Sequence, residues 1–423
     1  MLISPARCLY AGILLIMCGS PVLAQSSAAP AGITLDSAIS RALANSPELT
    51  TFGYQINARQ GDVEQAGLRP NPELIVSIEN AAGTGEFAGT DGLETTLSIG
   101  WILERNKRQY RVNAAMAGVS AMEVAAESKR QEVAAQTARL FLDSLVVQQR
   151  MELLTYSVAL YEAEVEFARK RVDAGRLPRM NLTRSQATLE MVKLDLEDAE
   201  HELRTAIRRL AAQWGELQPD FTAISGDLRI LPQPVDYDEL LARVESNPEL
   251  LQNLSESALR EAELRLAQAV AKPSWRVTAG IRRHEQTDDV ALVAGVIVPL
   301  ATSDRNQGGI AAARARLAVT NAEREALQIR LKTQLFALHQ ELLHSLHQSG
   351  AFRDEIIPLL ESVEADIQQA HESGRYSYRE LWTVQSELVE ARMASIEANA
   401  NAHRMAIEIE RLIGAPLSAA GKP

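Results

Sequence analysis

Four short segments of the chain alternate between apolar and polar residues, the pattern of a half-buried strand. In one of them Leu97, Ile99 and Trp101 are separated by Ser98 and Gly100. The other three are similar, although the last is apolar throughout and alternates weakly. The predicted strands are 73–80, 93–103, 275–282 and 290–298.

Most of the remaining chain shows apolar residues every three or four positions, which predicts helices. In the longest segments this spacing averages 3.5 residues, the period of left-handed coiled-coil packing. A helix over 105–172 would be about 100 Å long at 1.5 Å per residue. Asp36, Asp236 and Asp238 are predicted N-caps, and Pro358 predicts a kink or local break. The predicted helices are 35–67, 105–172, 180–213, 236–271, 305–372 and 378–413.

The chain contains an internal repeat: two copies of one sequence pattern, spaced about 200 residues apart. The anchors keep their order in both copies: 42–49 with 243–250, Pro72 with Pro273, Arg105-Asn106 with Arg305-Asn306, Gly175 with Gly374, and Gly215 with Gly414. Each copy predicts one helix, two strands and a long helical hairpin. The predicted organisation is a signal peptide over 1–24, repeats over 25–215 and 235–415, a linker over 216–234 and a tail over 416–423.

Strands of about 9–11 residues with one apolar face match those of membrane β-barrels. Four strands cannot close a barrel, and open strand edges are not tolerated in lipid. Either the strands are soluble or several chains share one barrel. The predicted lipid face is Leu74, Val76, Ile78, Leu97, Ile99, Val277, Ala279 and Ile281. Trp101 and Trp275 suit the membrane interface, with ordinary core packing as the alternative.

The N-terminal segment has the features of a secretory signal peptide: one charge at Arg7, an apolar run over 9–17 and a small-residue cleavage site ending at Ala24. The run is too short to span a bilayer. Both cysteines, Cys8 and Cys18, lie in this segment, so the mature chain is predicted to have no thiol. Lipidation at Cys18 is an alternative form of processing.

Composition narrows the function classes. The net charge is −12, which argues against nucleic-acid binding. No catalytic motif, phosphate loop or cofactor signature occurs, so the chain is predicted not to be an enzyme and to need no cofactor. His344 and His347, with His339 nearby, could contact a metal on one helix face. Because surface histidines are commoner, no metal site is predicted.

These residues together resemble the outer membrane efflux protein (TolC) family. The resemblance rests on the twofold repeat, on the segment 35–49 and on the Gly-Arg turns at Gly175 and Gly374. It implies a mainly α protein with a transmembrane β-barrel: a homotrimer with a twelve-stranded barrel, four strands per chain, continued by a twelve-helix periplasmic coiled-coil α-barrel. It also implies an outer-membrane location, contact with its lipid, a periplasmic adaptor and an inner-membrane RND transporter.

A narrower resemblance is to the cobalt-zinc-cadmium branch, carried by 69–72, Glu79-Asn80 and 104–108. Where that branch usually has a glycine pair, this chain has Arg105-Asn106. The implied function is passive conduction of divalent heavy-metal cations in a tripartite efflux system. Drug efflux or protein secretion are alternatives within the class, and a soluble periplasmic coiled-coil adaptor is the alternative of a different class.

In the family the hairpin tips close the tunnel and meet the adaptor. Mapped onto this sequence, the candidates are Asp173, Gly175, Arg176, Leu177, Glu372, Gly374, Arg375, Tyr376 and Ser377. Their charged and hydroxyl groups could form a ring of ion pairs and hydrogen bonds that opens on docking. The alternative is plain helix capping by glycine with solvated charges.

Overall fold

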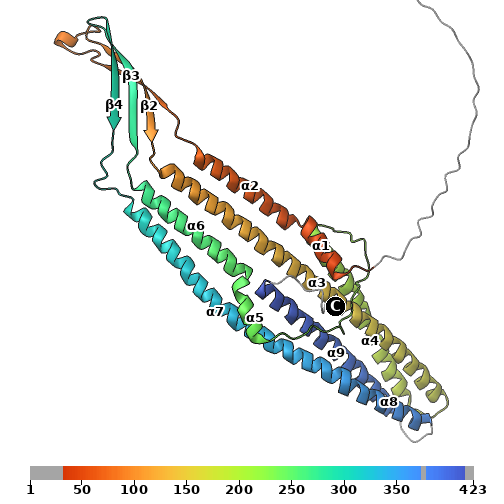
Figure 1. Ribbon diagram of the computed structural model, residues 1–423. Coiled ribbons are helices and arrows are strands. Elements are labelled where there is room, and N and C mark those ends of the chain that lie inside the picture. The colour runs from red at the N-terminus through yellow and green to blue at the C-terminus, as the bar shows by residue number, and fades with distance from the viewer. Residues whose placement is uncertain (1–31, 373–377, 415–423) are drawn as a thin grey trace, which may run out of the picture.

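A computed structural model describes residues 32–372 and 378–414. The molecule is long and narrow, with a β-sheet at one end and packed helices along the rest of its length (Figure 1). Both predicted repeats contribute to each part, and the elements follow one another in the same order in each repeat.

The four predicted strands are present and form one antiparallel sheet in the order β1-β2-β3-β4. Their ends differ from the predicted bounds by at most two residues. The strands are β1 (Glu73–Glu79), β2 (Glu94–Leu103), β3 (Trp275–His284) and β4 (Asp289–Ile297), with a 3-10 turn η1 (Gly85–Phe87) between the first two. Because β2 pairs with β3, the sheet joins the two repeats.

The helices of the first repeat are α1 (Leu35–Asn45), α2 (Pro47–Gly67), α3 (Lys107–Asp173), α4 (Arg179–Ala211) and the 3-10 turn η2 (Ala212–Trp214). Those of the second are α5 (Tyr237–Arg243), the 3-10 turn η3 (Val244–Ser246), α6 (Pro248–Val270), α7 (Gln307–Ala351), the π turn η4 (Phe352–Ile356), α8 (Ile357–Glu372) and α9 (Tyr378–Ile413). Among the described residues, none of these helices is long and apolar enough to cross a bilayer.

The single helices predicted over 35–67 and 236–271 are wrong in one respect, since each is broken before a proline. Ser46 and Asn247 adopt extended backbone angles, with ψ of 124° and 131°. A proline disfavours the helical conformation of the residue before it and is itself well placed at a helix start. Each repeat therefore begins with a short helix and a longer one.

The predicted caps are partly corrected. Thr34, and not Asp36, caps α1, its hydroxyl accepting from the amide of Ser37 at 3.4 Å. Asp236 caps α5 as predicted, with Asp238 in the first turn. The break predicted at Pro358 takes the form of the π turn η4, which ends two residues before the proline. Proline has no amide hydrogen, and a π turn is one way for a helix to absorb that loss.

The helices form a wall with two long edges (Figure 1). Next to the sheet, α3 packs between α2 and α6, and α6 packs on α7. Towards the hairpins, α3 packs on α4 and α9, and α9 packs on α7 and α8. One edge of the wall thus carries β1, α2 and α4, and the opposite edge carries β4, α7 and α8.

The largest apolar core lies where the segment between the repeats crosses the helices. Leu228 of this segment is fully buried against Phe141, Leu142 and Leu210. Gln148 of α3 holds Ile224 by two bonds, accepting from its amide at 2.8 Å and donating to its carbonyl oxygen at 3.1 Å. The predicted linker is therefore a packed part of the wall.

Candidate functional site: the sheet faces, the repeat junction and the hairpin tips

The strand register places apolar side chains together on one face of the sheet. Leu97 lies opposite both Val76 and Ile281, and Ile99 lies opposite Leu74 and Ala279. Since directly opposed residues share a face, the predicted lipid-face residues do lie on one side. We call this the apolar sheet face after its apolar residues, although the register also places Thr95 and Arg283 on it, beside Ile78. Its apolar residues include Leu74, Val76, Ile78, Leu97, Ile99, Trp101, Val277, Ala279, Ile281, Leu292 and Val296.

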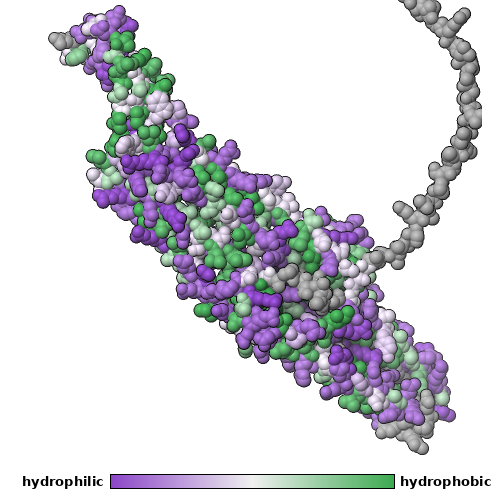
Figure 2. All heavy atoms as spheres, viewed as in Figure 1, coloured by the Kyte–Doolittle hydropathy of each residue, from purple (hydrophilic) through white to green (hydrophobic). Residues whose placement is uncertain are grey.

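This face is uncovered in the single chain. Val76 is 60% exposed and Leu292 is 89% exposed. Figure 2 shows the apolar residues gathered along the sheet, between a polar loop region and the polar start of the helices. Trp101 and Trp275 are also exposed, so they are not core residues of the single chain. A contiguous exposed apolar surface marks a site of contact with lipid or another protein.

The other face of the sheet is polar and crossed by ion pairs. Arg282 of β3 binds Glu79 of β1 at 3.0 Å and Glu94 of β2 at 2.8 Å. Near the opposite end of the strands Arg276 binds Glu73 at 3.2 Å. We call this the polar sheet face after its polar residues, although the register also places Ile75, Ile102, Val293 and Ile297 on it. Its polar residues are Glu73, Ser77, Glu79, Glu94, Thr96, Ser98, Arg276, Thr278 and Arg282.

The tip of the first hairpin is a glycine-capped helix end. Gly175 has φ +69°, in the left-handed region that favours glycine. Its amide donates to the carbonyl oxygen of Val172 at 2.9 Å, and the amide of Arg176 donates to that of Arg171 at 2.8 Å. This pair of bonds is the Schellman motif, so the predicted turn at Gly175 is confirmed.

The predicted gate residues are only partly described. Asp173 and Arg176 are exposed and Leu177 is half-buried. Within the described residues, neither Asp173 nor Arg176 forms an ion pair. Glu372 ends α8, while Gly374, Arg375, Tyr376 and Ser377 lie outside the described residues. The predicted ring of polar contacts at the tips therefore stays a prediction.

Each hairpin has a polar contact between its arms that the sequence analysis missed. Ser185 of α4 donates to Glu164 of α3 at 2.7 Å, and Gln385 of α9 donates to Glu364 of α8 at 2.8 Å. Burial raises the pKa of Glu164, and the bond from Ser185 offsets this only in part. The members of each pair are 21 residues apart. Folding each hairpin about its glycine would have brought them together.

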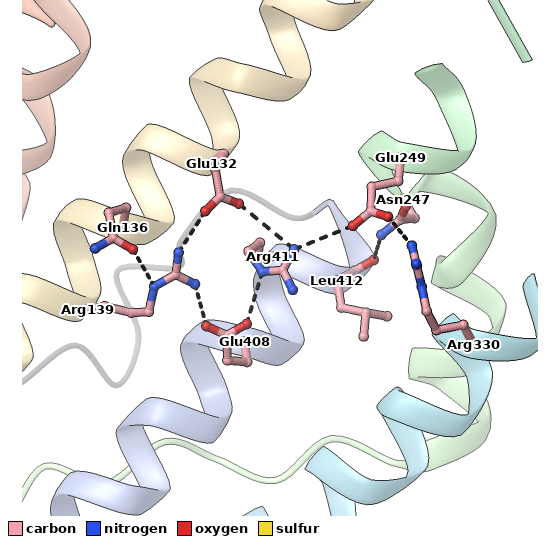
Figure 3. Close-up of polar contacts among 9 residues, drawn as sticks. All are labelled: Glu132, Gln136, Arg139, Asn247, Glu249, Arg330, Glu408, Arg411 and Leu412. Atoms are coloured by element: carbon pink, nitrogen blue, oxygen red, sulfur yellow. Dashed lines mark hydrogen bonds and ion pairs between the residues drawn. The ribbon is translucent and has the colours of Figure 1, made fainter. Parts of the chain in front are cut away.

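A network of charges joins the two repeats at the middle of the wall (Figure 3). Arg139 of α3 binds Glu408 of α9 and also Glu132, the latter at 2.8 Å. Arg411 binds Glu408 at 3.0 Å and lies 3.8 Å from Glu249 of α6. We call these five residues the junction network. Burial raises the pKa of Glu408, but hydrogen bonds from Arg139 and Arg411 outweigh it, and the net pKa is lowered.

The repeated Pro-Glu-Leu motif supplies an equivalent ion pair in each repeat. Glu48 binds Lys129 at 2.6 Å, and Glu249 binds Arg330 at 2.6 Å. The motif thus ties the second helix of each repeat to the long helix that follows. Its glutamates were recognised in the sequence as repeat anchors, but their partners were not.

Two histidines, His339 and His403, bind the segment between the repeats. Nε2 of His339 donates to the carbonyl oxygen of Val235 at 3.0 Å, and that of His403 donates to Leu228 at 3.2 Å. Burial lowers the pKa of His403. His344 and His347 are exposed. Clusters of three or more potential metal ligands are absent from 32–372 and 378–414.

Known proteins match this chain in sequence and in fold. Residues 38–216 match the family described as outer membrane efflux protein. The chain is 25% identical to the cobalt-zinc-cadmium resistance protein CzcC of Cupriavidus metallidurans, covering 93% of this chain and 92% of that protein. It is 24% identical to the nickel-cobalt-cadmium resistance protein NccC of Alcaligenes xylosoxydans, covering 77% of this chain and 72% of that protein.

The fold is that of solved outer-membrane channels. The open-state MtrE channel of Neisseria gonorrhoeae superposes with a TM-score of 0.72 at 14% identity, covering 92% of this chain and 91% of that one. The similarity to CzcC spans both repeats, and the family match covers the first. The predicted resemblance to the outer membrane efflux protein family is confirmed: the first repeat matches that family, and the whole chain is similar to a heavy-metal resistance protein and has the fold of solved outer-membrane channels.

Proposed function

We propose that three copies of this chain form an outer-membrane duct that passively conducts divalent heavy-metal cations. The observation that carries the proposal is the sheet. It is open at β1 and β4, and its apolar face is uncovered. In lipid every backbone polar group needs an internal partner. The edges must therefore pair with β4 and β1 of further copies.

The helical edges support the same closure. On α7, Ile329, Phe336 and Leu343 recur every seven residues and are exposed. On the opposite edge, Met191 and Leu194 of α4 are 65% and 61% exposed. A contact between two different edges is head-to-tail, and it gives a ring when the rotation from copy to copy closes. Three copies supply twelve strands, more than the roughly eight that side chains can fill, so a lumen remains.

In the closed assembly the apolar sheet face contacts lipid and the polar sheet face lines the lumen. The helices continue the wall away from the membrane into the periplasm. The hairpin ends, with Asp173, Gly175, Arg176 and Leu177, are then the part of the duct that lies deepest in the periplasm, farthest from the outer membrane. We assign these ends to contact with a periplasmic adaptor, which links the duct to an inner-membrane RND transporter.

Divalent metals are the proposed cargo because the relatives carry cobalt-zinc-cadmium and nickel-cobalt-cadmium resistance in their names. The proposed role involves no catalysis, since a passive duct makes and breaks no bonds. The alternative of a soluble adaptor is not supported, because all four strands join one sheet with an exposed apolar face. Drug efflux and protein secretion remain outcomes of the test below.

The first experiment is extraction of the mature protein from outer membranes with detergent, followed by native mass measurement. A mass of three chains is expected, and a water-soluble monomer would contradict the proposal. The second experiment compares a strain lacking the gene with its parent. Loss of tolerance to cobalt, zinc or cadmium is expected, whereas lost drug tolerance with unchanged metal tolerance would reverse the assigned cargo.

A further inference from the structure

The register of the sheet opposes two carboxylates on the polar sheet face. Glu79 of β1 is the direct partner of Glu94 of β2. Like charges directly opposite each other destabilise a sheet. Two neighbouring carboxylates also offer the oxygen ligands by which proteins bind divalent cations. A duct for such cations should not retain them here.

Arg282 of β3 satisfies both carboxylates. Its guanidinium binds Glu79 at 3.0 Å and Glu94 at 2.8 Å, and its Nε donates to the hydroxyl of Thr96 at 2.9 Å. Thr96 is the direct cross-strand partner of Arg282, and from this position the guanidinium reaches both acids. Its side chain is 30% exposed, and a guanidinium stays charged at every physiological pH.

We propose that Arg282 is a fixed counter-ion of the lumen, which keeps the Glu79–Glu94 pair from holding exported cations. The inference rests on the proposed function, because it requires the polar sheet face to line the duct. In a trimer, three such arginines neutralise half of six carboxylates at one level. Without Arg282, each Glu79–Glu94 pair becomes a site of two carboxylates.

The same strand provides a matched control. Arg276 also lies on the polar sheet face and binds one acid, Glu73. The cross-strand partner of Glu73 is Gly100, so no second carboxylate opposes it. Loss of Arg276 changes the lumen charge by the same amount as loss of Arg282. Only loss of Arg282 frees a pair of opposed acids.

The experiment uses the purified full-length protein in planar lipid bilayers, with zinc chloride as the probe. Arg282→Gln is expected to increase cation preference and to be blocked by zinc at a concentration at least about tenfold lower than wild type, a difference of about 1.4 kcal/mol in binding. Arg276→Gln is expected to stay near wild type in zinc sensitivity. The triple variant Arg282→Gln, Glu79→Gln, Glu94→Gln should lose the sensitivity.

Equal zinc sensitivity of Arg282→Gln and Arg276→Gln would overturn the inference. If Arg282→Gln does not assemble, the double variant Glu79→Gln, Glu94→Gln tests the same idea. It leaves the arginine unpaired and should shift the reversal potential towards anions, and an unchanged potential would overturn the inference. Failure of wild-type protein to form any channel would instead count against the proposed function.

Discussion

The side-chain amide of Asn247 donates to the carbonyl oxygen of Leu412 at 2.7 Å, and the two residues lie 165 positions apart. The amide oxygen of the same side chain accepts from the backbone of Leu250 at 3.1 Å. One buried residue therefore caps α6 and holds the end of α9 against it. The corresponding residue of the first repeat, Ser46, is also buried but makes no side-chain cap bond.

Asn247→Ala is expected to lower the free energy of unfolding by about 2–4 kcal/mol, through the lost cap and the unpaired carbonyl of Leu412. Asn247→Asp keeps the cap acceptor but loses the donor, and should fall between the alanine variant and wild type. Ser46→Ala is the matched control and should be nearly neutral. Denaturant unfolding in detergent, followed by circular dichroism, gives the comparison. If Asn247→Ala and Ser46→Ala destabilised the protein equally, the role assigned to the Asn247 side chain would be contradicted.

The helices, strands and turns could be predicted from the sequence, because each is determined mainly by the residues within it. Alternation in 93–103 indicated β2, and the glycine at Gly175 indicated the hairpin turn. The missed breaks at Ser46 and Asn247 were also local, since each residue precedes a proline. The repeat anchors further indicated which residues hold equivalent places in the two halves.

The contacts between distant elements could not be predicted in the same way. Arg282 and Glu94 are 188 residues apart, and their contact depends on the pairing of β2 with β3 and on its register. A shift of one residue would have put Arg282 on the lipid side. The ion pair between Arg139 and Glu408 likewise requires the packing of α3 on α9, and no local pattern specifies that.

The junction network makes stability depend on pH in a defined direction. The folded-state pKa of Glu408 lies below its ordinary value of 4.5, so folding favours its charged form. Glu408 contributes its full stabilisation at pH values above its unfolded-state pKa. This contribution is lost as the pH falls through the lower pKa of the folded state. Thermal unfolding of wild type and Glu408→Gln over the range pH 7 to about 3 should show this.

The melting temperature of Glu408→Gln should lie below that of wild type at neutral pH, and the gap should close as the medium becomes acidic. Burial raises the pKa values of Asp143 and Glu164, so these two groups change stability with pH in the opposite direction. Both are present in wild type and in the variant, so the comparison isolates the effect of Glu408. A gap that stays constant with pH would show that Glu408 contributes by packing and not by charge.

The two faces of β1 should respond differently to charge. Val76 lies on the apolar sheet face, and its neighbour Ser77 lies on the polar sheet face. Val76→Lys is expected to destabilise the membrane-inserted protein by about 2–4 kcal/mol, the cost of a lysine facing the bilayer midplane. Ser77→Lys faces water in the proposed lumen and should have little effect. The measurement is the amount of trimer recovered from outer membranes, and equal losses would place both side chains in the same surroundings.

The hairpin tip depends on a backbone conformation that only glycine adopts without strain. A Cβ at Gly175 would meet no atom within 4 Å, so the cost of Gly175→Ala comes from its positive φ alone, about 1–2 kcal/mol. The matched control is Gly118→Ala in α3, where a Cβ would lie 4.0 Å from Leu259, an ordinary contact. This control should stabilise its helix by up to about 1 kcal/mol. Hydrogen exchange of peptides covering 165–185 should accelerate in Gly175→Ala only. Unchanged exchange there would mean that the turn relaxes into another conformation, and the tip would then not need the geometry we assign to adaptor contact.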